Sequence, residues 1–86
     1  MTSKTLIIEA ENGLHARPVS ELVKLAKSLS TVVYISTPVR QVRADSMLGV
    51  LSLGLKKGVE ITVSAEGNGE EDAVNAIGGF IMSVKE

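Results

Sequence analysis

The sequence contains no cysteine and no tryptophan, and it has one histidine, one tyrosine and one phenylalanine among its 86 residues. The lack of cysteine excludes a disulfide scaffold, a thiolate zinc site and a cysteine nucleophile. Two aromatic side chains, Tyr34 and Phe80, are too few for the stacking surface with which an RNA-recognition sheet binds bases. The chain has nine basic and ten acidic residues, so no overall electrostatic attraction to nucleic acid or to an anionic membrane is expected.

The sequence also lacks any apolar run long enough for a secretory signal or a membrane span, which predicts a cytoplasmic protein. An apolar content of 44% and a charged content of 22% are typical of a folded globular chain. We expect one domain over residues 1–86, because dividing so short a chain would leave two parts unable to build a core.

Hydrophobic periodicity predicts the element order β-α-β-β-α-β-α. Short β-branched or alternating runs predict strands at residues 5–9, 31–36, 39–43 and 59–66. Apolar residues spaced three or four apart predict helices at residues 16–29, 47–53 and 69–84. Gly78 and Gly79 weaken the end of the third helix. Strands with one polar face indicate a largely antiparallel sheet covered by helices on one side, an α+β two-layer fold.

The only histidine, His15, lies in the segment N-G-L-H-A-R-P at residues 12–18, between a glycine-containing loop and the first predicted helix. Pro18 is tolerated in a first helical turn, so the helix is expected to begin at about Ala16. The free amides of Ala16 and Arg17, with the positive end of the helix dipole, would bind phosphate and favour the neutral imidazole. A neutral imidazole can accept a phosphoryl group, and the Arg17 guanidinium matches phosphate oxygens. The segment therefore predicts phosphoryl transfer on His15, with Ala16 and Arg17 binding the phosphate.

Other interpretations of His15 carry less support. A lone histidine beside a helix start is more often a capping or packing residue. Gly13, the helix start, Arg17 and the absence of a second histidine together favour the phosphate site. One histidine with scattered carboxylates provides no ligand cluster, so no metal is indicated, and no cofactor either. A serine hydrolase is improbable, because the chain has no G-x-S-x-G and no second base.

At this point the sequence resembles the HPr family, the histidine-containing phosphocarriers of the bacterial sugar phosphotransferase system. The resemblance covers the whole chain and depends on NGLHARP at residues 12–18, DSMLGVLSLG at residues 45–54, the chain length and the element order. It implies an open-faced β-sandwich, with a four-stranded antiparallel sheet in the order 1-4-2-3 under three helices. It also implies a stoichiometric carrier rather than an enzyme in the strict sense. On this resemblance, His15 accepts a phosphoryl group on Nδ1 from enzyme I, Arg17 stabilises it, and sugar-specific enzyme IIA components receive it.

Ser46 precedes the second predicted helix, where a serine is first of all an N-cap. The resemblance implies a second role, because Ser46 matches the serine that an ATP-dependent HPr kinase/phosphorylase modifies in Gram-positive-type members to signal catabolite repression. Gly49 and the Met47-Leu48 pair fit this regulated branch of the family. A phosphoryl group at a helix N-terminus need not unfold the helix.

Three residues near Ser46 depart from the family pattern. Asp45 stands where a lysine is common, and Arg40 and Arg43 replace polar or smaller residues in the preceding strand. A carboxylate beside Ser46 is expected to weaken recognition by the kinase. One alternative to the carrier is a regulatory module that binds a catabolite-control transcription factor and in which His15 is vestigial. The intact H-A-R triplet argues against this alternative.

The second helix is too short to bury all its apolar side chains. We expect Val50 and Leu53 in the core and Met47, Leu48 and Leu51 on the surface, beside His15. Together with polar residues of the first helix they would form an apolar patch with a positive rim, suited to transient docking of acidic surfaces. This partner surface consists of Ser20, Lys24, Lys27, Met47, Leu48 and Leu51.

Overall fold

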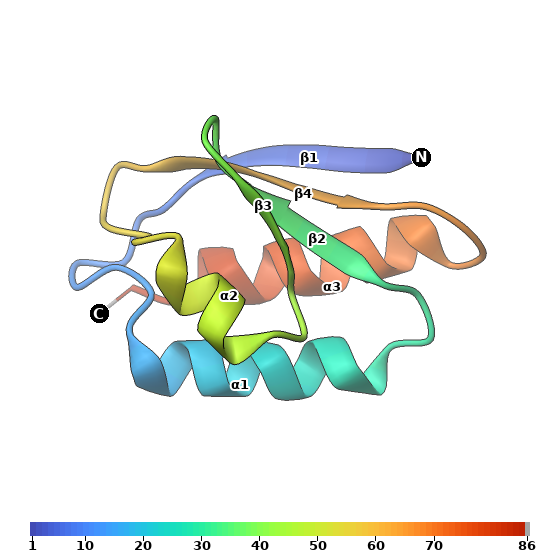
Figure 1. Cartoon of the computed structure of the whole chain (residues 1–86), viewed down its shortest axis with the longest axis horizontal. Helices are drawn as coiled ribbons and strands as arrows, with labels where there is room; N and C mark the ends of the chain where they lie inside the picture. Colours follow the sequence, from blue (N-terminus) through green and yellow to red (C-terminus); the bar gives the residue numbers. More distant parts are fainter. Residues whose placement is uncertain (86) are drawn as a thin grey trace.

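The structure is a computed structural model that describes residues 1–85. Its elements are β1 (Thr2–Ile7), α1 (Ala16–Ser28), β2 (Val33–Ser36), β3 (Gln41–Arg43), α2 (Met47–Ser52), β4 (Glu60–Ala65) and α3 (Glu70–Ser83). The strands form one antiparallel sheet in the order β1-β4-β2-β3, and the helices cover one of its faces (Figure 1). This confirms the predicted α+β fold, its element order and its strand order.

The ends of several strands differ from the sequence prediction. β1 begins at Thr2 rather than at residue 5 and ends at Ile7 rather than at residue 9. Its first residues are polar, so only their pairing with β4, beginning with Thr2 opposite Ala65, identifies them as a strand. β2 begins at Val33 rather than at residue 31, and β3 at Gln41 rather than at residue 39. The other elements are shorter than predicted by single residues at their ends.

The core lies between the sheet and the helices. Ile35, Ile61 and Val63 point inward from the sheet, pack with Leu22 of α1 and Ile77 of α3, and are buried like them. Full burial of one such side chain contributes about 1.5–3 kcal/mol relative to leaving it in water.

Two expectations about single apolar residues meet different outcomes. Val50 is buried, as predicted for α2. The prediction that Leu53 lies in the core is wrong, because Leu53 is half-buried and packs at the edge of the core. The reason is that Leu53 is the C-cap of α2 and so follows its last helical turn. Leu6 and Ile8 both pack against the core, Ile8 fully buried and Leu6 partly.

α3 continues through Gly78 and Gly79 to Ser83. A Cβ at Gly78 would lie 3.5 Å from Cδ1 of Leu6, so the first of the two glycines faces β1 at ordinary contact distance. A Cβ at Gly79 would meet no atom within 4 Å. The helix therefore tolerates the glycine pair that weakens it in the sequence analysis, because packing against the sheet holds it.

The two ends of the described chain lie at opposite ends of the long axis, which measures 33 Å (Figure 1). The ammonium group of Met1 forms an ion pair with Glu70 at 3.1 Å, at the start of α3. Lys85, just after α3, forms an ion pair with Glu9 at 2.7 Å, close to the loop that leads to α1. Among residues 1–85, no helix combines the length and the apolar character that crossing a membrane requires.

Candidate functional site

His15 is the N-cap residue of α1. Its backbone is extended, with φ −93° and ψ −173°, and its carbonyl accepts the first helical hydrogen bond, from the amide of Val19 at 3.0 Å. The imidazole is exposed and makes no capping hydrogen bond. The amides of Ala16 and Arg17 have no acceptor among residues 1–85, and Pro18 has no amide hydrogen. The positive end of α1 thus presents free donors beside an exposed imidazole.

The loop before His15 is held by backbone hydrogen bonds to distant segments. The amide of Leu14 donates to the carbonyl of Leu55 at 2.8 Å, and the amide of Glu11 donates to the carbonyl of Lys85 at 3.1 Å. Gly13 lies between them with φ 67°, and a Cβ there would overlap the carbonyl oxygen of Leu55. Only glycine fits this left-handed, crowded position, so Gly13 fixes the path of the chain into α1.

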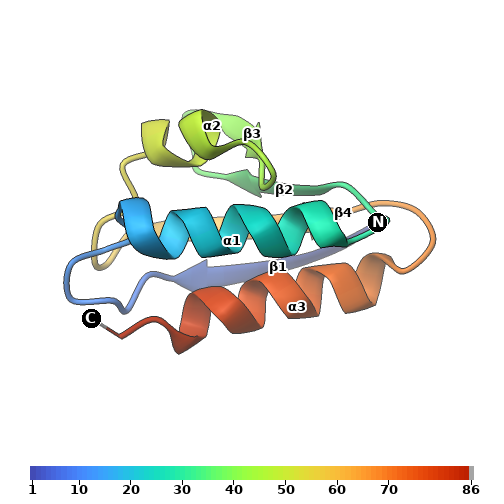
Figure 2. The ribbon, with the colours of Figure 1, turned by 90° about the horizontal axis from the view of Figure 1, so that it is seen from below.

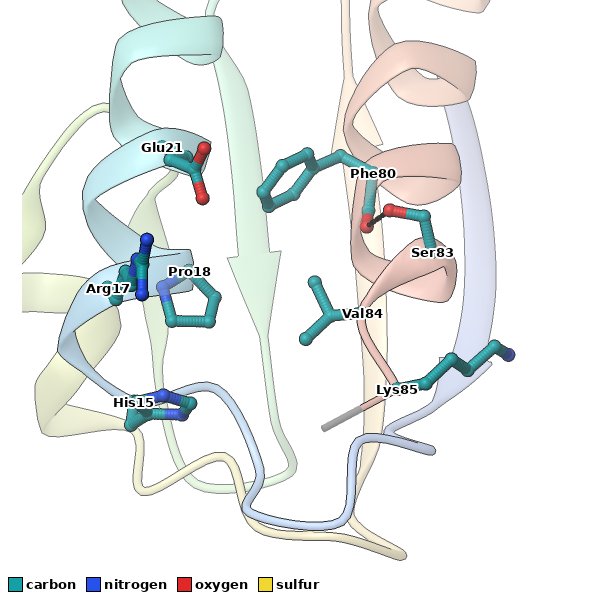
Figure 3. A pocket seen from close by; sticks show the side chains of 8 residues that line it. All are labelled: His15, Arg17, Pro18, Glu21, Phe80, Ser83, Val84 and Lys85. Atoms are coloured by element: carbon teal, nitrogen blue, oxygen red, sulfur yellow. Dashed lines mark hydrogen bonds between the residues drawn. The ribbon is translucent and has the colours of Figure 1, made fainter.

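An open pocket of about 570 Å³ lies between the start of α1 and the end of α3 (Figure 3). His15 and Arg17 lie on the α1 side, and the ring of Phe80 extends from α3 toward α1. Pockets that combine apolar walls with a few convergent polar groups are the usual binding sites of small ligands. The residues that line it are His15, Arg17, Pro18, Glu21, Phe80, Ser83, Val84 and Lys85.

The sequence analysis assigned no functional role to five of the eight residues that line this pocket. Phe80, Ser83, Val84 and Lys85 come from the far end of the chain, and only the packing of α3 beside α1 brings them to His15. Glu21 lies on α1 itself, but it belongs to no motif that the sequence analysis identified. No local motif marks any of them, although Phe80 is one of two aromatic residues in the chain.

Arg17 is the cation best placed to meet an anion at His15. Its side chain is exposed and has no carboxylate within ion-pair distance among residues 1–85. Lys85 also lines the pocket, but its ammonium is turned to Glu9, and this hydrogen bond lowers the pKa of the Glu9 carboxyl. In the described part of the chain, no three histidine, aspartate or glutamate side chains approach closely enough to hold a metal ion.

Ser46 is the N-cap of α2, and its Oγ accepts a hydrogen bond from the amide of Gly49 at 3.1 Å. A Cβ at Gly49 would lie 3.0 Å from that oxygen, so the glycine leaves space beside the hydroxyl. Asp45 receives two hydrogen bonds from the Arg43 guanidinium, at 3.1 and 2.9 Å. These bonds lower the pKa of the Asp45 carboxyl. The carboxylate next to Ser46 is thus balanced by an adjacent guanidinium.

The residues of the partner surface lie on two helices that pack together, α1 and α2 (Figure 2). Met47, Leu48 and Leu51 are 37%, 84% and 38% exposed, as expected. Lys24 and Lys27 are exposed and Ser20 is half-buried. The hydrogen bond from Arg43 is the main cause of the lowered pKa of Asp45, which precedes α2, and the charge of Lys27 on α1 adds to it. At the other end of α2, Leu55 contacts the loop before His15.

Comparison with known proteins gives one family for nearly the entire chain. Residues 2–83 match the family described as the PTS HPr component phosphorylation site. A solved structure of HPr-C-His from Thermoanaerobacter tengcongensis is 36% identical, with 96% of this chain and 93% of that chain covered and a TM-score of 0.89. The phosphocarrier protein HPr of Bacillus anthracis is 30% identical, with coverages of 93% and 95% and a TM-score of 0.87.

A regulatory relative also has this fold. The Bacillus subtilis catabolite repression containing protein Crh, solved as a dimer with swapped domains, is 26% identical to this chain. The alignment covers 100% of this chain and 99% of that chain, with a TM-score of 0.76.

Proposed function

Because this chain belongs to the HPr family of the phosphotransferase system, we propose that it accepts a phosphoryl group from enzyme I on His15 and passes it to enzyme IIA components. It acts as a stoichiometric carrier and not as an enzyme in the strict sense, and its place of action is the cytoplasm. The observation that carries this proposal is the exposed imidazole of His15, beside two free amides and the unpaired Arg17 at one helix start.

The transfer moves a phosphoryl group from a donor atom of enzyme I to a ring nitrogen of His15. The ring nitrogen forms a bond to phosphorus while the bond from phosphorus to the donor atom breaks. The donor atom keeps the electron pair of the broken bond and takes up a proton, and the His15 ring releases the proton of its other nitrogen to solvent. The protein contributes position and charge: Arg17 and the amides of Ala16 and Arg17 meet the phosphoryl oxygens as negative charge moves onto the site.

The site geometry suits a carrier that must also release the group. The pocket is open and the His15 side chain is exposed, so a partner protein can approach the imidazole from solvent (Figure 3). The partner surface lies next to it on α1 and α2, where an apolar patch with Lys24 and Lys27 at its rim suits short-lived docking of acidic proteins.

Incubation with phosphoenolpyruvate and enzyme I, followed by mass spectrometry, tests the carrier directly. The expected result is one acid-labile phosphoryl group per chain, absent from His15→Ala. Because the imidazole is exposed and makes no capping bond, His15→Ala should keep its fold, which circular dichroism checks. Arg17→Lys, which keeps the charge but loses the forked donor, should accept the group more slowly. Uptake by His15→Ala equal to that of the unchanged chain would refute the proposal.

Ser46 is proposed as a second, regulatory phosphorylation site, modified by an HPr kinase/phosphorylase and read by a catabolite-control transcription factor. Support comes from the space that Gly49 leaves beside the Ser46 hydroxyl and from the Arg43 guanidinium, which balances the charge of Asp45. The likeness to Crh keeps a purely regulatory role as the second candidate.

The two candidates differ in which residue takes up phosphate. ATP and a cognate kinase should give an acid-stable adduct that Ser46→Ala lacks, while phosphoenolpyruvate and enzyme I label His15. A chain labelled only at Ser46 would support the regulatory module and contradict the carrier. A chain labelled only at His15 would remove the regulatory proposal.

A further inference from the structure

The pocket beside His15 contains one carboxylate among its described residues, that of Glu21. Glu21 lies on α1 one helical turn beyond Arg17, on the same wall of the pocket (Figure 3). A negative charge at this place opposes the binding of a phosphoryl group, because the group itself brings roughly 1.5 to 2 negative charges.

No structural task accounts for Glu21. Its side chain is exposed and forms no hydrogen bond or ion pair with any residue in the range 1–85. It lies beyond the first turn of α1, which contains no acidic residue, so it does not stabilise the helix dipole. Arg17 is four positions before it, an order in which an acid–base pair on a helix is weaker than the reverse. Among residues 1–85 neither side chain forms an ion pair. Arg17 is therefore available to a phosphoryl group, and Glu21 keeps its negative charge beside the pocket.

We propose that Glu21 raises the phosphoryl-transfer potential of the carrier by electrostatic repulsion of the group on His15. Arg17 and the free amides attract the phosphoryl oxygens, and Glu21 limits the resulting stability of the phosphorylated form. The group is thus held tightly enough to be carried and loosely enough to be released to the next acceptor. This inference depends on the proposed function, since it needs a phosphoryl group on His15.

The effect is of moderate size and depends on salt. The pocket is open, so water and salt screen the interaction, and charges exposed to solvent interact only weakly. Removing the charge should change the equilibrium between phosphorylated and free carrier by about threefold, as expected for an exposed charge pair. Salt at high concentration should remove most of this difference.

An exchange experiment between two carriers measures this equilibrium. Phosphorylated, ¹⁵N-labelled unchanged protein is mixed with an equal amount of unlabelled Glu21→Gln and a trace of enzyme I, which transfers the group in both directions. Mass spectrometry at equilibrium then gives the share of phosphoryl group on each chain. We expect about a threefold preference for Glu21→Gln at low salt. Glu71→Gln is the matched control: it removes the same charge from an exposed position at the far end of α3 and should share the group equally.

A second variant separates charge from shape. Glu21→Asp keeps the carboxylate and should share the phosphoryl group equally with the unchanged protein. Equal sharing by Glu21→Gln, or a preference that persists in high salt and also occurs in Glu21→Asp, would overturn the inference while leaving the carrier intact. Failure of the unchanged protein to take up any phosphoryl group would instead contradict the proposed function, and the inference with it.

Discussion

The amide of Leu14 donates a 2.8 Å hydrogen bond to the carbonyl of Leu55, and this bond joins the loop before His15 to the segment after α2. Leu14 is buried, although the next residue, His15, is exposed. The bond therefore fixes the position of the imidazole without enclosing it.

Gly13→Ala should disturb the contact between the loop before His15 and Leu55. The residue has φ 67°, and the added Cβ would overlap the carbonyl oxygen of Leu55, so the loop must move. We expect a loss of about 2–3 kcal/mol in the free energy of unfolding and slower phosphoryl uptake on His15. Urea denaturation and the enzyme I assay measure both.

Gly54→Ala is the matched control for Gly13→Ala. Gly54 has a similar φ of 63°, but a Cβ there would meet nothing within 4 Å. Gly54→Ala should therefore lose about 1 kcal/mol of stability, from backbone strain at the positive φ alone, and should keep the normal rate of phosphoryl uptake. Equal effects of the two variants would show that contact with Leu55 does not position the loop.

Gly79→Ala should stabilise the protein. Gly79 lies inside α3 with its α-carbon facing open space, and replacing glycine by alanine in such a place favours the helix by about 0.5–1 kcal/mol. A rise in the urea midpoint with unchanged phosphoryl uptake is the expected result. An unchanged or lowered midpoint would contradict the description of α3 as regular through both glycines.

Glu70 should make stability sensitive to strong acid. The hydroxyl of Thr2 donates a 2.5 Å hydrogen bond to its carboxylate, and the amide of Gly67 and the Met1 ammonium also contact it. Together they lower the pKa of Glu70 from 4.5 to about 2. A lowered pKa in the folded state means that the stabilisation is complete above about pH 4.5 and is lost as the pH falls toward 2.

Glu70→Gln is therefore expected to reduce stability at neutral pH and to flatten the acid limb of stability against pH. Glu71→Gln, in the same helical turn, provides the control and should leave that limb unchanged. Urea midpoints between pH 2 and 7 measure both. If Glu70→Gln still lost stability steeply as the pH falls toward 2, other carboxyl groups would be responsible for the acid sensitivity.

Ser46→Ala should lower stability by about 1 kcal/mol, because the hydroxyl caps the amide of Gly49 at the start of α2. Ser46→Asp keeps an N-cap acceptor and should lose little. The comparison separates capping from regulation: if Ser46→Asp transfers phosphate slowly at full stability, the effect of charge at this position lies in docking. A normal rate of phosphoryl transfer by Ser46→Asp would show that negative charge at this position does not control transfer.

Leu48→Ala should affect partners and not folding. Leu48 is 84% exposed on α2, so truncation should change the free energy of unfolding by less than about 0.5 kcal/mol. Loss of a docking contact should slow transfer from enzyme I several-fold. Val39→Ala, at an 88% exposed position in the turn between β2 and β3, is the control and should transfer at the normal rate. Equal rates for both variants would exclude Leu48 from the docking surface.

The sequence pattern predicted the helices and strands and their order because the signals for them are local. Alternating residues of β4, the apolar stripe of α1 and the proline near the start of that helix each depend on neighbours within a few positions. The strand order came from the family resemblance, since periodicity does not determine which strands pair. The start of β1 was missed for the same reason: Thr2 is a strand residue through its partner Ala65, which lies in β4.

The residues of the candidate site also differ in whether a local sequence pattern identifies them. His15, Ala16 and Arg17 are consecutive in the sequence, and one motif identified them. Phe80 and Val84 reach the pocket through the packing of α3 against α1 and the sheet, which no local pattern encodes. The balance of charge around Ser46 was also beyond sequence, because Asp45 alone suggested a repulsive carboxylate and only its hydrogen bonds to Arg43 show a balanced pair.

The opposite placement of Met1 and Lys85 has a practical consequence for experiments with attached groups. A purification tag or fluorophore joined at the Met1 end lies at the opposite end of the molecule from the start of α1, where His15 is the N-cap, and leaves access to the imidazole open. The same attachment at the Lys85 end begins beside the pocket, where it would crowd an incoming protein. Immobilisation and labelling of this carrier should therefore use its N-terminal end.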